Sequence, residues 1–188
     1  MERAYNPPRK YEEHSYVLDF NTRGKSTTVR GREGIIVTAI GEDRLTLLEI
    51  LGQPNSTFEV GEKIFIGKEG RTKVLSVLGK MTYDRISSSA QTELPGVVEK
   101  IVTENEKRFV DYLNNAQPLT PRIHALELIP GIGKTYMRLM LEEREKKKFD
   151  NFADLQERIG FKEPIKQISK RIMEEITGET RMNLFVKR

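Results

Sequence analysis

The chain has no cysteine, no tryptophan and only two histidines, His14 and His124, among its 188 residues. The lack of cysteine excludes disulfides, thiolate metal sites, iron–sulfur clusters and cysteine nucleophiles. The two histidines lie far apart in the sequence, so they do not form the ligand set that a zinc site needs. We therefore expect neither a metal nor any other cofactor.

Long apolar runs are also missing. No segment approaches the roughly 20 apolar residues that a membrane-spanning helix needs, and Met1–Lys10 has no apolar stretch behind its charges, as a secretory signal would. With 37% hydrophobic and 32% charged residues, the chain can build a core under a heavily charged surface, which is typical of globular proteins. We expect a cytoplasmic protein with no membrane partner.

The net charge of +4 is unevenly distributed. Residues 1–118 contain 17 basic and 17 acidic residues, whereas residues 119–188 contain 15 and 11. A modest positive charge is weak support for nucleic-acid binding by itself. Its position is more informative, because the excess coincides with the motif described below.

Residues 15–85 contain short segments typical of β-strands, after a polar tail over residues 1–14. Turn residues separate these segments, notably at Gly41–Arg44 and Gly67–Gly70. Five short strands in about 70 residues favour a small barrel, and we predict an OB-like β-barrel. The predicted strands are Tyr16–Phe20, Ile35–Ile40, Leu45–Leu51, Lys63–Gly67 and Val74–Leu78.

The rest of the chain is predicted to be helical, which makes the fold class α+β. A helical linker over residues 86–118 begins with Ser87 as a cap, and Pro95 should kink or restart its first helix. An all-α domain covers residues 119–178, where apolar residues recur every three or four positions, and a C-terminal tail covers 179–188. The helices of this domain are predicted to begin near Thr120, Lys134, Phe152 and Ile165.

One motif joins the first two of these helices. In Ile129-Pro-Gly-Ile-Gly-Lys134, here named the glycine turn, Gly131 and Gly133 permit unusual backbone angles and leave no side chain between an amide and a ligand. Ile132 can point into the core and hold the turn. The following helix N-terminus favours an anion, and Lys134 adds a positive charge. These four residues therefore predict a site for a nucleic-acid backbone.

Residues 123–144, with Leu126-Glu-Leu-Ile-Pro-Gly-Ile-Gly-Lys134, resemble the helix-hairpin-helix family. The resemblance implies that amides around the glycines contact consecutive phosphates with little sequence preference. A second hairpin, Asn151–Pro164, resembles the degenerate partner of a tandem pair, because it keeps Gly160 but lacks the second glycine. We expect it to give structural support. The alternative for the glycine turn is a tight helix–helix turn used for packing or for a protein partner.

Catalytic alternatives do not fit the sequence. Gly133-Lys-Thr135 resembles the end of a nucleotide-hydrolase phosphate loop, but that loop needs a glycine where Leu128 stands and follows a strand. An ATPase is therefore excluded. A hydrolase or nuclease needs clustered carboxylates or a nucleophile–base pair, and Asp19, Asp84 and Asp111 are scattered. We expect no enzymatic activity.

A second candidate surface lies in the predicted barrel. Between Asp19 and Glu33 the chain has four basic residues and no acidic one. Glycines and the Ser26–Thr28 run predict a flexible loop there, and in OB barrels the corresponding loop often grips single strands. A solvated basic loop fits the same pattern. The basic residues predicted to contact nucleic acid are Arg23, Lys25, Arg30 and Arg32.

A second family resemblance covers nearly the whole chain. The segments that carry it are Gly34–Arg44, Leu47–Glu49, Ile64–Gly67, Glu93–Leu94, Asn105–Glu106, Phe109–Val110 and the glycine turn. In this order the segments resemble an archaeal family of unknown function that joins an OB-like barrel to a tandem helix-hairpin-helix domain. The resemblance implies RNA or DNA binding and brings no reaction. The alternative is a protein–protein assembly module in a ribosomal or repair complex.

Overall fold

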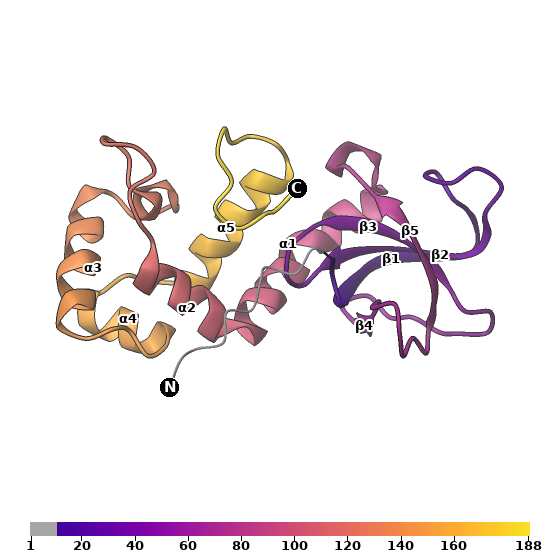
Figure 1. Cartoon of the computed structure of the whole chain (residues 1–188), viewed down its shortest axis with the longest axis horizontal. Coiled ribbons are helices and arrows are strands. Elements are labelled where there is room, and N and C mark those ends of the chain that lie inside the picture. Colours follow the sequence, from indigo (N-terminus) through magenta and orange to yellow (C-terminus); the bar gives the residue numbers. More distant parts are fainter. Residues whose placement is uncertain (1–10) are drawn as a thin grey trace. The chain divides into compact units, whose positions relative to one another are not determined.

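The structure is a computed structural model that describes residues 11–188, so the first ten residues of the predicted polar tail lie outside it. The described part has a mixed α+β fold, as predicted: a curled five-stranded antiparallel sheet forms a half-barrel and is followed by five α-helices (Figure 1). Contacts divide the chain into two compact units. The first extends to Leu94 and includes Phe185–Arg188, and the second is Pro95–Leu184.

The strands of the first unit lie in the order β4-β1-β2-β3-β5, and every neighbouring pair is antiparallel. Strands β1, β2 and β3 form a meander, and the turn predicted at Gly41–Arg44 joins the last two. Within residues 11–188 no ladder joins β4 to β5, so the sheet is open there. All five predicted strands are confirmed, as β1 His14–Lys25, β2 Glu33–Gly41, β3 Leu47–Gly52, β4 Lys63–Phe65 and β5 Val74–Lys80.

Strand register places the core of the half-barrel. Val37 of β2 lies opposite Ile50 of β3, and both are fully buried together with Val17 of β1. Burial of one such side chain stabilises the fold by roughly 1.5–3 kcal/mol. The buried cluster consists of Val17, Val37, Ala39, Leu48, Ile50, Phe58, Ile64, Ile66 and Val74.

Helix α1 begins as predicted but passes through its proline. The Ser87 hydroxyl accepts a hydrogen bond from the Ala90 amide at 3.0 Å, and α1 continues through Pro95 to Glu104. Of the kink or restart predicted at Pro95, the restart is therefore wrong. A proline inside a helix costs about 3 kcal/mol, and buried apolar residues on both sides of Pro95 offset that cost. These residues are Leu94, Val97, Val98 and Ile101.

The other helical elements are a 3-10 turn η1 (Tyr83–Arg85), helix α2 (Glu106–Asn115), a second 3-10 turn η2 (Ala125–Leu128), and helices α3 (Lys134–Lys146), α4 (Phe152–Ile159) and α5 (Pro164–Ile176). The three helices predicted after the glycine turn are thus confirmed. Within the described residues, no helix combines the length and the hydrophobicity that a membrane span requires.

The prediction that a helix begins at Thr120 is wrong. The Thr120 hydroxyl accepts the amide of Ile123 at 3.0 Å and closes a local turn, a contact that competes with helix formation. Only η2 forms, and His124 caps it: its Nδ1 accepts the Leu126 amide at 3.1 Å, while Glu127 Oε1 accepts the His124 amide at 3.0 Å. The glycine turn therefore follows one 3-10 turn, and not an α-helix.

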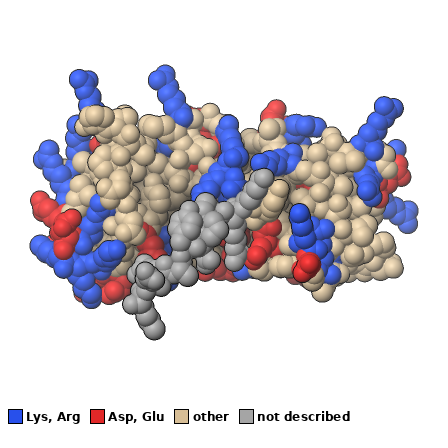
Figure 2. All heavy atoms as spheres, in the orientation of Figure 1, with Lys and Arg blue, Asp and Glu red and all other residues tan. Residues whose placement is uncertain are grey.

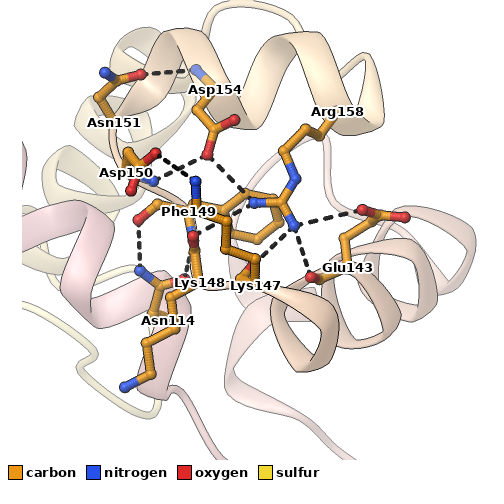
Figure 3. A network of polar contacts seen from close by, with 9 residues as sticks. All are labelled: Asn114, Glu143, Lys147, Lys148, Phe149, Asp150, Asn151, Asp154 and Arg158. Atoms are coloured by element: carbon orange, nitrogen blue, oxygen red, sulfur yellow. Dashed lines mark hydrogen bonds and ion pairs between the residues drawn. The ribbon is translucent and has the colours of Figure 1, made fainter.

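Arg158 of α4 holds the end of α3 (Figure 3). Its guanidinium donates to the carbonyl oxygens of Glu143 and Lys147, each at 2.7 Å. The Glu143 carbonyl also accepts the Lys147 amide at 3.1 Å, whereas Lys147 lies at the C-cap, where a helix offers its carbonyl no amide. Arg158 also pairs with Asp154 at 3.2 Å and lies 4.5 Å from the centre of the Phe149 ring. One side chain thereby joins α3, α4 and the segment between them.

Asn114 of α2 holds the same segment through its side-chain amide (Figure 3). Its Nδ2 donates to the Phe149 carbonyl at 2.9 Å, and its Oδ1 accepts the Phe149 amide at 2.8 Å. Both groups are buried, where an unpaired amide or carbonyl would cost about 1–3 kcal/mol. Helices α2, α3 and α4 therefore form one frame, which positions α3 and the glycine turn before it.

A buried ion pair ties α5 to the residue before the glycine turn. Arg171 Nε donates to Glu175 Oε2 at 2.9 Å, and Glu175 is fully buried. The same guanidinium donates to the carbonyl oxygens of Leu128 at 3.3 Å and Met182 at 2.6 Å. The carboxylate also accepts the Leu184 amide at 3.0 Å. Both charges are thus paired inside the second unit.

We expect Glu175→Gln to lower the free energy of unfolding by about 3–5 kcal/mol, because it leaves the Arg171 charge buried without a counterion. Arg171→Met should have a similar effect for the same reason. The double variant should lose less stability than the sum of the two single losses, since neither charge then remains unpaired. Urea unfolding followed by circular dichroism measures this coupling, and strictly additive losses would contradict it.

Candidate nucleic-acid interface

The glycine turn leads directly from η2 into α3. Ile129 and Ile132 are both buried, and the Ile132 amide donates to the Ile129 carbonyl at 3.0 Å, which closes the turn. Ile132 thus points into the core, as the sequence indicated. Gly131, Gly133 and Lys134 are exposed around it. The structure therefore brings the four predicted residues together on one short, anchored segment.

The two glycines of the turn differ in what the fold requires of them. Gly131 has φ +80°, and a Cβ there would lie 3.3 Å from side-chain atoms of Phe161 and Gln167. Its backbone conformation alone favours glycine. Gly133 has an ordinary φ of −84°, and a Cβ there would meet no atom within 4 Å. Nothing inside the described chain requires a glycine at position 133.

The first turn of α3 is open to solvent. Its first helical hydrogen bond runs from the Met137 amide to the Gly133 carbonyl at 2.9 Å, so the amides before Met137 have no acceptor within the helix. Gly133, the N-cap, has no side chain to accept from them. By contrast, the N-cap of α4, Asn151, accepts the Asp154 amide at 2.7 Å. The start of α3 therefore presents unpaired donors and the positive end of a helix dipole.

A hollow of about 240 Å³ lies beside the start of α3, and its lining includes three cationic side chains. These are Arg122, Lys134 and Arg138, all exposed, and no ion pair engages them in residues 11–188. Glu127 also lines the hollow, but its Oε1 accepts the His124 amide. Of these three cations, the sequence predicted only Lys134 as a binding residue. The spacing of Lys134 and Arg138, one helical turn apart, was a signal that could have identified Arg138.

The second hairpin lies against the glycine turn. The Tyr136 hydroxyl of α3 donates to the Gly160 carbonyl at 3.5 Å, and the rings of Tyr136 and Phe161 meet edge to face with centroids 5.7 Å apart. Helix α5 begins beside them with Pro164, which has no amide hydrogen, after the exposed carboxylate of Glu163. An anion is therefore favoured at α3 over α5. The exposed lysines of this hairpin are Lys162, Lys166 and Lys170.

The four basic residues predicted in the barrel lie on the β1–β2 hairpin, in the first unit. Two of them, Arg23 and Lys25, belong to β1, which is longer than predicted, and the other two lie in the connection 26–32. All four are exposed, and Lys25 forms a long ion pair of 3.8 Å with Glu33.

Over the α3–α4 end of the second unit, Lys and Arg side chains lie among acidic side chains (Figure 2).

The β1–β2 connection is held at its base by a buried carboxylate. Glu49 of β3 accepts hydrogen bonds from the Ser26 hydroxyl, from the Thr27 amide at 3.1 Å and hydroxyl at 2.9 Å, and from the Thr28 amide at 3.3 Å. Burial acts to raise the pKa of Glu49, but these hydrogen bonds together hold it below its usual value. Residues 26–28 are therefore anchored, where the sequence indicated a flexible loop.

Other polar side chains that could suggest catalysis have local partners. Asp19 accepts the Phe20 amide and the Ser87 hydroxyl, and Asp111 pairs with Lys107 on one exposed helix face. In the part of the chain that the structure describes, no three His, Asp or Glu side chains gather as metal ligands would. The geometry of the glycine turn remains the arrangement with the clearest chemical use, which is to bind an anion.

We expect Glu49→Gln to lower stability by about 1–3 kcal/mol at neutral pH, because charge-assisted hydrogen bonds to residues 26–28 are lost. The folded-state pKa of Glu49 lies below the unfolded value. Its contribution is therefore complete above the unfolded pKa of roughly 4.3 and is lost as the pH falls through the folded-state value. Denaturant unfolding at pH 7 and at lower pH measures this. Equal pH dependence of the variant and the original protein would contradict it.

Comparison with known proteins places the chain in a family. A family model described as "Protein of unknown function (DUF655)" matches residues 11–187. The chain is 40% identical over 184 residues to the uncharacterized protein MJ0038 of Methanocaldococcus jannaschii, covering 97% of this chain and 83% of that protein. It is also similar to the crystal structure of Af1531 from Archaeoglobus fulgidus, with a TM-score of 0.82, 36% identity, and coverage of 94% of this chain and 100% of that chain. The chain therefore belongs to the DUF655 family, whose members here come from archaea.

Proposed function

We propose that this protein binds RNA or DNA without catalysing a reaction, and that the glycine turn holds the phosphate backbone. The observation that carries the proposal is Gly133. Its φ is ordinary and the space around it is open, so a serine or asparagine there would cap α3 and stabilise it by a few tenths of a kcal/mol relative to glycine. A glycine instead leaves the amides of α3 accessible from outside, as contact with a phosphate requires.

The charges around the turn support the same proposal. Lys134 and Arg138 lie one helical turn apart beside those amides, and Arg122 lines the same hollow. Within residues 11–188 no ion pair engages these three cations, so they repel one another, and a bound phosphate relieves that repulsion. The basic β1–β2 hairpin, anchored by Glu49, is proposed as a second backbone contact.

We further propose that the half-barrel is an OB-like barrel and that the second unit is a tandem helix-hairpin-helix domain. The strand order and the opening between β4 and β5 support the first assignment, since an OB-fold is a five-stranded, partly open barrel. The contact between the glycine turn and the second hairpin supports the other assignment. In this chain η2 takes the place of the first helix of the first hairpin.

We expect Gly133→Asp to separate binding from stability. An aspartate at this N-cap accepts the free amides of α3 and complements the helix dipole, so stability should stay equal or rise by up to about 1 kcal/mol. Its charge and its hydrogen bonds block a phosphate, so affinity for a labelled duplex should fall roughly tenfold or more, equivalent to about 1.4 kcal/mol. Fluorescence anisotropy with duplex RNA and duplex DNA measures the affinity.

The matched control is Asn151→Ala, which removes the cap of α4. It should lower stability by about 1 kcal/mol and leave the affinity unchanged. If Gly133→Asp binds the duplexes as tightly as the original protein, the glycine turn is not the site. A protein partner captured at high salt, with no affinity for either duplex, would favour the assembly-module alternative. Magnesium-dependent cleavage of either duplex by the pure protein would contradict the non-catalytic part of the proposal.

We expect Arg138→Gln to change the salt dependence of duplex binding. Each phosphate contact that is lost lowers the slope of log K against log salt by about 0.9, because fewer counterions are released. The control is Lys107→Gln, which removes the same charge from an exposed ion pair with Asp111 and should leave the slope unchanged. Equal slopes for Arg138→Gln and the original protein would remove Arg138 from the interface.

A further inference from the structure

The open side of the half-barrel holds a pocket of about 750 Å³. Its walls come from both strands that face the opening, with Phe65 at the end of β4 and Val77 on β5. Leu48 and Ile66, which belong to the buried core of the sheet, also line it. The volume lies in the range of about 300–1,000 Å³ that is typical of small-molecule sites.

Arg71 keeps the two sides of the opening together. Its guanidinium donates to the carbonyl oxygens of Gly67 at 2.8 Å and Ile66 at 3.0 Å, and to that of Leu75 on β5 at 3.3 Å. These bonds bridge the end of β4 to β5 in place of a ladder. They also occupy the carbonyls that an added peptide strand would use, so strand addition is not favoured here.

Aromatic side chains line one wall of the pocket. A Cβ at Gly67 would lie 2.5 Å from the Phe65 ring, so glycine at that position makes room for the ring. His14 contacts the same ring edge to face, with centroids 5.3 Å apart. Tyr11 also lines the pocket and is 62% exposed, and the Lys68 ammonium lies 5.4 Å from the centre of its ring.

Basic residues surround the mouth of the pocket. Arg44, Lys68 and Lys80 line it, and the backbone of the segment after Leu184 contacts Arg44. The Lys187 amide donates to the Arg44 carbonyl at 3.0 Å, and Arg44 Nη2 donates to the Arg188 carbonyl at 3.3 Å. The sequence left Lys187 and Arg188 without a role, and the structure places them beside the lining residue Arg44.

The acidic residues at the pocket do not cancel this charge. Glu12, Glu13 and Glu69 line it. Glu12 is buried and accepts the amides of Asp43 at 2.8 Å and Arg44 at 2.7 Å, so it serves the β2–β3 turn. Burial raises the pKa of Glu12, against the effect of these two hydrogen bonds. Glu13 and Glu69 are then outnumbered by the four cations that line the pocket, Arg44, Lys68, Arg71 and Lys80.

We propose that this pocket binds the base of a nucleotide within a single-stranded RNA or DNA segment. The apolar floor and the Phe65 ring contact the base, and the surrounding cations hold the flanking phosphates. Stacking on an aromatic ring within a positively charged groove is how proteins bind single strands. This site goes beyond the proposed function, because it lies in the first unit and would recognise a base, whereas the glycine turn is proposed to hold the phosphate backbone.

The test measures binding of the full chain to fluorescein-labelled ten-residue oligouridylate and oligothymidylate by anisotropy. Phe65→Ala should lower the affinity roughly five- to 100-fold, the range for loss of one stacked base. Phe65→Leu keeps apolar volume and removes the ring, so it should also weaken binding. Affinity of the original protein for either oligonucleotide supports the site, and the arm that binds identifies the sugar. Affinity for neither overturns the proposal.

Two surface variants keep the test valid if the Phe65 variants do not fold. Lys68→Gln with Lys80→Gln changes only exposed side chains at the rim and should weaken single-strand binding. The control, Lys107→Gln with Lys147→Gln, removes the same charge from two exposed ion pairs elsewhere and should leave the affinity unchanged. Equal losses in both double variants would show only a non-specific effect of charge and would overturn the pocket.

Photo-crosslinking of a 4-thiouridine oligonucleotide separates this proposal from the previous one. Crosslinks should map to peptides that contain Tyr11 or Phe65, and they should persist in Gly133→Asp. If Gly133→Asp keeps its duplex affinity while the pocket variants lose single-strand affinity, only the glycine turn fails. Crosslinks confined to residues 95–184 would overturn the pocket and leave the glycine turn standing.

Discussion

The buried ion pair between Arg171 and Glu175 is the constraint on which the second unit depends. A charge in the interior is tolerated only when it is paired and its remaining hydrogen-bonding groups are satisfied, so several segments must meet at this point. Arg171 reaches the carbonyl of Leu128, the residue before the glycine turn. Burial, together with the negative charge of Glu175, raises the pKa of Tyr112 to about 12. Because Arg171 contacts Leu128, the ion pair on α5 positions the glycine turn that follows Leu128.

The two ends of helix α3 differ in their hydrogen-bond partners. At its C-terminus, Arg158 donates to the carbonyls of Glu143 and Lys147 and joins α3 to α4. At its N-terminus, Gly133 supplies no cap and the first amides stay accessible. A helix fixed at one end can present the other end to a ligand without losing its orientation, which is what a pre-organised anion site requires. This arrangement supports the proposed contact between the start of α3 and a phosphate.

The first unit follows the same physical rule with different residues. Glu49, Glu12 and Arg71 are charged groups whose partners are mainly backbone groups of the connections between strands. Each satisfies backbone groups that lie outside the strand ladders, because buried or half-buried backbone groups need hydrogen-bond partners. Arg71 joins the end of β4 to β5 across the opening, where no ladder joins the two strands. That opening is where the pocket lies.

The sequence alone determined the succession of strands and of the later helices along the chain and the inward direction of Ile132, because these depend on periodicity within a few residues. It indicated unusual backbone angles at both Gly131 and Gly133, and only Gly131 adopts one. It did not indicate that His124, and not Thr120, would cap the helical turn before the glycine turn, since both side chains can accept a nearby amide. In the sequence, Glu49 is one acidic residue in an apolar strand. Only the fold brings it to its hydrogen-bond partners in residues 26–28. The tertiary structure decided these contacts, the convergence of Arg122 and Arg138 on one hollow, and the return of Phe185–Arg188 to the first unit. Each joins segments whose encounter depends on packing between elements and not on local sequence.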